Sequence, residues 1–218
     1  MIGPARIRGI CAVLAATLAL GVVPALAQPA ARHDDSPAAT PLPLMPRYLL
    51  MDVQGRAVTQ EDFRGRFQLV SFGFISCPDV CPTTLLEVKQ ILDALGDQAA
   101  RLQPIFITVD PARDTREVLR EYTAAFDARI LGLRGSDALT RRAANEFRVR
   151  YEMVRDPAAP PGAYTVDHSA GMILLGPDGR TIVRFAYATP AKQLAERIGA
   201  LIQEERDRMP GAAPRPAR

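Results

Sequence analysis

The chain has 218 residues, of which 48% are hydrophobic and 23% are charged. That length suits one domain with appendages, and the composition is that of a globular protein, which excludes a wholly disordered chain. Three cysteines are too few for a small scaffold built on disulfide bonds. The net charge is +3, but the sequence has no basic block and no basic residues interleaved with aromatics, so no nucleic-acid partner is expected.

The first 27 residues have the pattern of an export signal. Arg6 and Arg8 precede an apolar run over 9–23, and Ala25-Leu26-Ala27 matches a cleavage site. Cleavage near Ala27 would leave a soluble protein, whereas retention of residues 9–27 would leave a single membrane anchor. Both alternatives predict that the rest of the chain is periplasmic or otherwise extracytoplasmic.

Three segments follow the export signal. Residues 28–46 are rich in Pro and Ala and predict a tether. Residues 47–208 predict one folded domain, and residues 209–218 predict a disordered tail. Without residues 1–27, two cysteines remain, Cys77 and Cys81. Two thiols this close in an exported protein are expected to act together as a redox pair, a metal clamp or a structural bridge.

Strand and helix patterns alternate along the predicted domain. Strands are predicted at 48–53, 56–58, 67–75, 104–109, 130–133, 149–154, 166–175 and 181–187. Amphipathic helices are predicted at 82–95, 114–126, 136–147 and 190–206. This order predicts an α/β domain of the thioredoxin-like plan, with a mixed sheet, helices on both of its faces and a late β-hairpin over 166–187.

A Cys-x-x-x-Cys turn leaves the buried strand at 67–75 and enters a helix. Cys77 and Cys81 stand at positions i and i+4, so both sulfurs can face one point at the helix N-terminus. The helix dipole and free amide groups there lower thiol pKa values. Two such thiols can form a disulfide, bind a soft metal or exchange with another disulfide. An inert bridge is the structural alternative.

His168, in the sequence Asp167-His168-Ser169, begins the late hairpin, which runs beside the cysteine turn in a thioredoxin-like fold. An imidazole there could be a third ligand, and two thiolates with one imidazole suit Cu(I). The alternative is a strand histidine without a ligand role. Zinc would require a fourth ligand, which Asp110 or Asp167 could supply.

Two further acidic residues follow the strand at 104–109. In an open α/β sheet, sites form beyond the carboxyl ends of the strands, which puts Asp110 and Asp114 near the cysteines. They are candidates for contacts that orient a loop or a partner. The alternative is a turn at Asp110 and helix capping by Asp114.

Together these segments resemble the Sco/SenC family of copper-binding, thioredoxin-like proteins. The matching stretches are FGFISCPDVCPTTL (72–85), TVDPARDT (108–115) and VDHSAGMILLGPDGR (166–180). The resemblance implies one Cu(I) per chain, held by Cys77, Cys81 and His168. It also implies a role in maturing the dinuclear copper centre of cytochrome c oxidase subunit II. Asp110 would then be a conformational or partner-contact residue and not a ligand.

The resemblance leaves more than one function open. The first hypothesis is a metallochaperone rather than an enzyme, with the copper-site domain of subunit II as partner. A copper donor or a thioredoxin-like reductant would be a second partner. The alternatives are a thiol–disulfide oxidoreductase that reduces the copper-site cysteines of that subunit, and a copper or redox sensor. Peroxidase activity is not expected, because Phe74-Ile75-Ser76 lacks the Thr and Pro that peroxiredoxins place before their cysteine.

Overall fold

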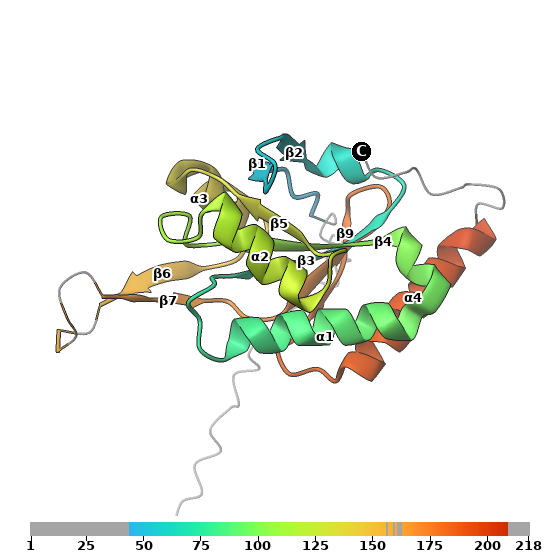
Figure 1. Cartoon of the computed structure of the whole chain (residues 1–218). Coiled ribbons are helices and arrows are strands. Elements are labelled where there is room, and N and C mark those ends of the chain that lie inside the picture. The colour runs from blue at the N-terminus through green and yellow to red at the C-terminus, as the bar shows by residue number, and fades with distance from the viewer. Residues whose placement is uncertain (1–43, 156, 159, 161–162, 209–218) are drawn as a thin grey trace, which may run out of the picture. The chain divides into compact units, whose positions relative to one another are not determined.

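The computed structural model describes residues 44–155, 157, 158, 160 and 163–208 (Figure 1). The predicted export segment, the predicted tether as far as residue 43 and the predicted tail at 209–218 lie outside these ranges. The domain bounds 47–208 stay a prediction. Within the described ranges, no helix combines the length and the apolar character that crossing a membrane requires.

The centre of the domain is one mixed, seven-stranded sheet. Its strands are β1 (Leu49–Asp52), β2 (Ala57–Thr59), β3 (Phe67–Gly73), β4 (Leu102–Thr108), β5 (Leu131–Arg134), β8 (Met172–Leu175) and β9 (Thr181–Phe185). Their spatial order is β2-β1-β5-β4-β3-β8-β9. β4 pairs in parallel with both β3 and β5, and the other neighbours pair antiparallel. The β3–β4 register places Gly73 opposite Thr108, so the loops after both strands begin side by side.

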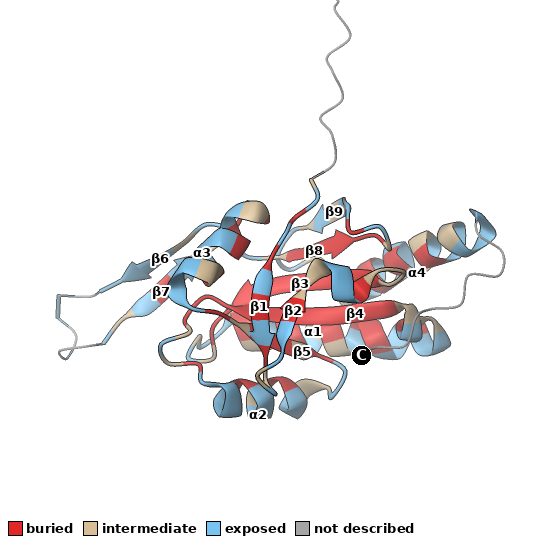
Figure 2. Cartoon of the chain, turned by 90° about the horizontal axis from the view of Figure 1, so that it is seen from above, coloured by how far each residue is buried: buried red, intermediate tan, exposed pale blue. Residues whose placement is uncertain are grey.

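Helices cover both faces of this sheet. They are α1 (Val80–Leu95), α2 (Arg116–Phe126), α3 (Asp137–Glu146), α4 (Ala191–Arg208) and the short 3-10 helices η1 (Gln60–Phe63) and η2 (Gly96–Arg101). Alternate side chains of β4 point to opposite faces. Phe106 belongs to the apolar cluster under α1, α2 and α4, whereas Ile105 and Ile107 belong to the cluster under α3. β3 and β4 are buried along their whole length (Figure 2). The predicted thioredoxin-like plan is confirmed.

The predicted strand over 166–175 is wrong, because it is two strands in different sheets. β7 (Thr165–His168) pairs with β6 (Tyr151–Val154), whereas β8 pairs with β3 and β9. Gly171 lies between them with φ +107°, and a Cβ atom there would be 2.3 Å from the carbonyl oxygen of Phe185. Only glycine tolerates both conditions. His168 therefore belongs to the β6–β7 hairpin and not to the predicted late hairpin.

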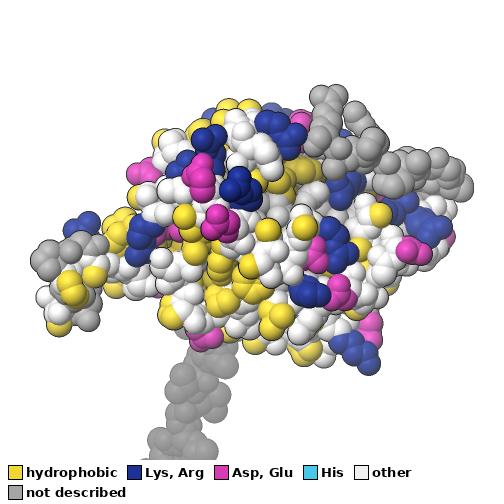
Figure 3. Space-filling model, viewed as in Figure 1, with side chains coloured by type: hydrophobic (Ala, Val, Ile, Leu, Met, Phe, Trp, Pro, Cys, Tyr) yellow, Lys and Arg dark blue, Asp and Glu magenta, His cyan; other side chains and the backbone are white. Residues whose placement is uncertain are grey.

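The β6–β7 hairpin projects from the rest of the domain (Figure 1). Neither of its strands is hydrogen-bonded into the seven-stranded sheet. Met153 and Val154 on β6 are 49% and 44% exposed. Hydrophobic side chains are visible on the projecting part in Figure 3. His168 is the last residue of β7, so it lies where the hairpin returns to the domain.

Two helices begin two residues away from their predicted starts. α1 begins at Val80, which puts Cys81 inside its first turn. α2 begins at Arg116, and the side chain of Thr115 caps it by accepting a hydrogen bond from the Val118 amide. The alternative that Asp114 caps this helix is therefore wrong. Its carboxylate contacts the cysteine turn instead.

Candidate metal centre

The cysteine turn joins the end of β3 to the start of α1. Cys77 and Cys81 are both free thiols, and Cys81 is only 2% exposed whereas Cys77 is partly exposed. The backbone N–H of Phe74 donates to Cys81 Sγ over 3.5 Å, and the N–H of Cys77 donates to the Phe74 carbonyl oxygen over 3.3 Å. The turn therefore folds back on itself at Phe74 and holds the Cys81 sulfur against the end of β3.

The two thiols differ in acidity. Burial by itself would raise the pKa of Cys77, but backbone N–H groups of Asp79, Val80 and Cys81 donate to its sulfur, and the net pKa is lowered. These amides belong to the N-terminal turn of α1, where no carbonyl group of the helix accepts from them. Burial raises the pKa of Cys81 to about 12. Cys77 is thus the more reactive thiol, and Cys81 keeps its proton at neutral pH.

This difference predicts the order of alkylation. In the reduced full-length chain at about pH 7.5, iodoacetamide is expected to modify Cys77 at least about tenfold faster than Cys81, because only the exposed thiolate reacts. Peptide mass spectrometry separates both sites from Cys11. In a Cys77→Ser variant, Cys81 should remain slow, which shows that burial protects it. Equal rates at the two sites would contradict the assignment.

His168 lies against the buried thiol. Its Nε2 atom is 3.6 Å from Cys81 Sγ, and its Nδ1 atom is 3.1 Å from the Ser169 carbonyl oxygen. A carbonyl group only accepts hydrogen bonds, so Nδ1 carries the proton of the neutral ring and the lone pair of Nε2 faces the sulfur. The Phe74 ring meets the imidazole edge-to-face, at 6.0 Å between centroids. A carbonyl group that fixes the tautomer in this way is common behind metal-binding histidines.

The three predicted ligands are not all in place for an ion. Among the residues that the structure describes, no three His, Cys, Asp or Glu side chains already have the spacing of a metal site. Of the three predicted ligands, Cys81 and His168 are already in contact. An ion held by both of them and by Cys77 would require the Cys77 side chain to turn toward the pair. The donor set itself, two sulfurs and one imidazole nitrogen, fits a soft monovalent ion such as Cu(I).

Asp114 holds the start of the cysteine turn through a hydrogen bond. It is 1% exposed, and its Oδ2 accepts hydrogen bonds from the Thr108 hydroxyl and from the Ile75 amide, the latter over 3.2 Å. Burial raises the pKa of Asp114. The carboxylate therefore fixes the backbone of Ile75, where the cysteine turn begins.

Asp110 is 3% exposed and has both carboxylate oxygens engaged. Oδ1 accepts from the Tyr164 hydroxyl over 2.8 Å, and Oδ2 is paired with Arg113. Asp167 is exposed on β7, and neighbouring side chains of a strand point to opposite faces, so it points away from the side on which His168 meets Cys81. Neither aspartate offers the fourth ligand that a zinc site requires. No sequence pattern indicated the contact between Arg113 and Tyr164, because it joins segments that are 51 residues apart.

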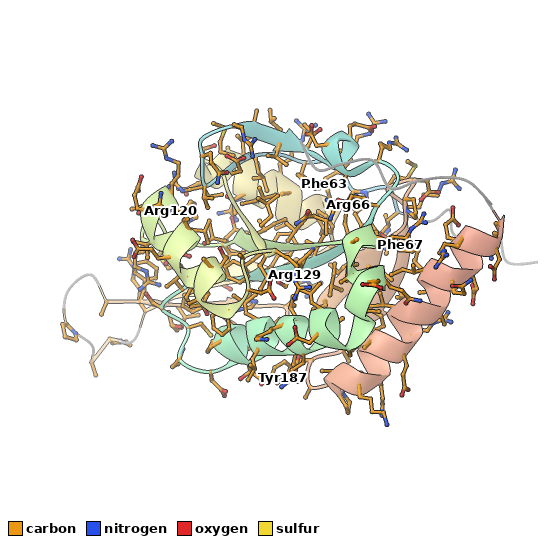
Figure 4. All side chains as sticks on the ribbon, turned by 45° about the vertical axis from the view of Figure 1, so that its right-hand side comes forward. Phe63, Arg66, Phe67, Arg120, Arg129 and Tyr187 are labelled. Carbon is orange, nitrogen blue, oxygen red and sulfur yellow. The ribbon has the colours of Figure 1, made fainter. Side chains whose placement is uncertain are left out.

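A larger cavity than the one beside His168 lies elsewhere in the domain. The cavity at His168 has a volume of about 590 Å³, and the larger one has a volume of about 980 Å³. Side chains that line the larger cavity include Phe63, Arg66, Arg120 and Arg129 (Figure 4). It adjoins Leu102, the first residue of β4, whereas the cysteine turn lies beyond the other end of this strand. Its described lining includes no cysteine or histidine, so the thiol chemistry belongs to the other end of the sheet.

Comparison with known proteins gives related sequences and structures. The chain is 36% identical over 154 residues to Protein sco1 of Schizosaccharomyces pombe, covering 70% of this chain and 59% of that protein. It is 38% identical over 151 residues to the human mitochondrial SCO2 homolog, covering 68% and 56%. The aligned segment thus spans less than two thirds of either relative.

Solved structures of similar fold include Sco proteins with copper bound. ScoI of Bradyrhizobium japonicum is 35% identical with a TM-score of 0.64, covering 72% of this chain and 96% of that one. Yeast Sco1 is 33% identical with a TM-score of 0.66, covering 78% and 97%. The family model described as SCO1/SenC matches residues 36–203. Since that match includes the cysteine turn, the loop after β4 and His168, the chain belongs to the SCO1/SenC family.

Proposed function

We propose that this protein is a copper metallochaperone that binds one Cu(I) ion through Cys77, Cys81 and His168. The observation that carries the proposal is the 3.6 Å contact between Cys81 Sγ and His168 Nε2, which the fold forms across 87 residues of chain. Two thiolates and one imidazole are soft donors, and three ligands leave an open edge for transfer to an acceptor. The structures of bacterial ScoI and yeast Sco1, which have copper bound, support copper as the metal.

Proton release accompanies loading with copper. A thiolate and not a thiol binds the metal, and the pKa of Cys81 is about 12, so its proton must leave when copper enters. The affinity for Cu(I) should therefore rise with pH across the neutral range. Cys77, whose pKa is lowered, is the thiol that can meet the incoming ion first.

The proposed acceptor is the dinuclear copper centre of cytochrome c oxidase subunit II. Membership of the SCO1/SenC family supports this assignment, and so does the predicted export signal, which would place the site outside the cytoplasm. A separate copper donor would supply the ion. The open edge of a three-coordinate site permits transfer by ligand exchange, in which a cysteine of the acceptor binds the ion before this chain releases it.

Anaerobic titration of the reduced full-length chain with Cu(I), against a competing chelator, tests the proposal. One ion per chain is expected, and a Cys77→Ser, Cys81→Ser double variant should bind none at this site. A Cys11→Ser variant is the matched control and should keep full stoichiometry. Retention of one tightly bound ion by the double variant would overturn the proposal.

A second function, reduction of the copper-site cysteines of subunit II, is favoured by the unequal acidity of the two thiols. The Cys77 thiolate would attack a substrate disulfide, forming a mixed disulfide and releasing one substrate thiolate. Cys81 would then lose its proton, with His168 Nε2 in reach to accept it, and attack the Cys77 sulfur. The second substrate thiolate leaves, so two electrons pass to the substrate and Cys77–Cys81 becomes a disulfide. A thioredoxin-like reductant would restore the dithiol.

The test of this second function is a trapped intermediate. Metal-free Cys81→Ser protein, incubated with a disulfide-bonded peptide of the acceptor's copper-site loop, should accumulate a mixed disulfide at Cys77, because the resolving thiol is gone. The Cys77→Ser variant should accumulate little, since the pKa of Cys81 is about 12. Absence of the mixed disulfide in the Cys81→Ser variant would overturn this second function.

A further inference from the structure

The hairpin that carries His168 has few ties to the domain. β6 and β7 pair only with each other among the described strands. Where β7 returns to the domain, the Ser169 amide donates to the Arg150 carbonyl oxygen over 2.9 Å, and the Arg150 amide donates to Ser169 Oγ over 3.1 Å. These bonds fix the end of β7 at His168, but they do not fix its far end at Thr165. The position of the imidazole therefore depends on what fixes that far end.

Arg113 contacts the far end of β7 through Tyr164, the residue before the strand. The guanidinium carbon lies 3.8 Å from the centroid of the Tyr164 ring, and Nη1 donates to the Tyr164 carbonyl oxygen over 3.0 Å. The Tyr164 hydroxyl donates to Asp110 Oδ1, and Arg113 is paired with Oδ2 of the same carboxylate. Three contacts thus fasten Tyr164 to the loop after β4.

Arg113 also reaches the ring that touches the histidine. Its guanidinium carbon lies 5.8 Å from the centroid of the Phe74 ring, and Phe74 in turn meets the His168 imidazole edge-to-face. Among the described residues, Nη2 of Arg113 is buried and has no hydrogen-bond partner, so the aromatic faces compensate for burying this end of the cation. One side chain therefore contacts the ring of the residue before β7 and the ring that meets His168, the last residue of β7.

We propose that Arg113 is a positioning residue for His168, which holds the β6–β7 hairpin against the loop after β4 so that the imidazole stays beside Cys81. The inference rests on the proposed function for its importance, but its geometry does not require a bound ion. Arg113 is not a ligand, because its guanidinium group stays protonated and has no lone pair to offer. Asp110 contributes by fixing both Arg113 and Tyr164.

Chemical modification of metal-free protein tests the position of the imidazole directly. Diethyl pyrocarbonate is expected to modify His168 at least about threefold faster in Arg113→Ala than in the wild type, because the freed hairpin uncovers Nε2. His33 in the same sample is the internal reference. Arg120→Ala removes an exposed arginine of α2 and should change neither rate.

A second pair of variants separates loss of the stack from loss of the fold. Tyr164→Ala should reproduce the faster modification, whereas Tyr164→Phe keeps the ring and should stay close to the wild type. If the wild-type protein binds Cu(I), the Arg113→Ala variant should bind it about tenfold more weakly with unchanged stoichiometry. That loss is expected when a contact outside the ligand set that positions a ligand is removed. Thermal unfolding of each variant shows whether it is folded.

The outcomes distinguish this inference from the proposed function. Wild-type protein that binds no Cu(I) would overturn the proposed function, and the modification rates would still decide the role of Arg113. Wild-type protein that binds Cu(I), together with unchanged modification rates in folded Arg113→Ala and Tyr164→Ala, would overturn the positioning role.

Discussion

Replacing His168 by alanine is expected to weaken Cu(I) binding by at least about 100-fold, or about 3 kcal/mol. The change removes the only nitrogen donor among the three proposed ligands and leaves two sulfurs, of which the Cys81 thiol has a pKa of about 12. The His168 side chain is only partly buried on a projecting hairpin, so the free energy of unfolding should change by less than about 1 kcal/mol. Competition against a Cu(I) chelator without oxygen measures the effect.

The chain supplies a matched control for this experiment. His33 is the other histidine, and it lies in the predicted tether outside the described residues. His33→Ala should retain the wild-type affinity, which separates loss of this imidazole from loss of any imidazole. An affinity of His168→Ala equal to that of the wild type would remove His168 from the site and leave a dithiol only.

Replacing Gly73 by alanine is expected to damage both stability and the site. A Cβ atom there would lie 2.7 Å from Cys81 Sγ and 2.8 Å from the Phe106 ring. Both neighbours are at least 98% buried, so neither can move aside freely. Overpacking of this kind costs about 1–3 kcal/mol, which corresponds to a fall in melting temperature on the order of 5 °C. Displacement of Sγ should also lower the Cu(I) affinity about tenfold.

Gly199 in α4 provides the comparison. A Cβ atom there would approach the end of the Gln98 side chain at 3.1 Å, and this flexible amide can move. Alanine in a helix interior is favoured over glycine by up to about 1 kcal/mol, so Gly199→Ala should be neutral or stabilising. Thermal unfolding and chelator competition on both variants check the pair. An unchanged melting temperature and affinity in Gly73→Ala would show that the turn relaxes around the methyl group.

Local patterns predicted much of the fold correctly. The apolar runs that became β3 and β4 are long and continuous because these strands are buried on both faces, and that pattern leaves little ambiguity. The same reasoning failed over 166–175. This segment looks like one strand in the sequence, but the chain passes from the β6–β7 sheet to the seven-stranded sheet at Gly171. The alternative that Asp114 caps α2 failed because the next residue, Thr115, is also suited to capping, and only the tertiary partners of the two residues decide between them.

The sequence by itself determined the chemistry of this protein: a pair of thiols at a helix N-terminus, one histidine far along the chain, and three motifs whose combination resembles a single family. These are properties of residue type and spacing. Only the tertiary structure decided that His168 arrives on a separate hairpin, that the two thiols differ in acidity, and that Asp110, Arg113 and Tyr164 hold the hairpin in place. The physical reason is that burial and contacts between distant segments depend on how the elements pack, and no local pattern encodes that packing.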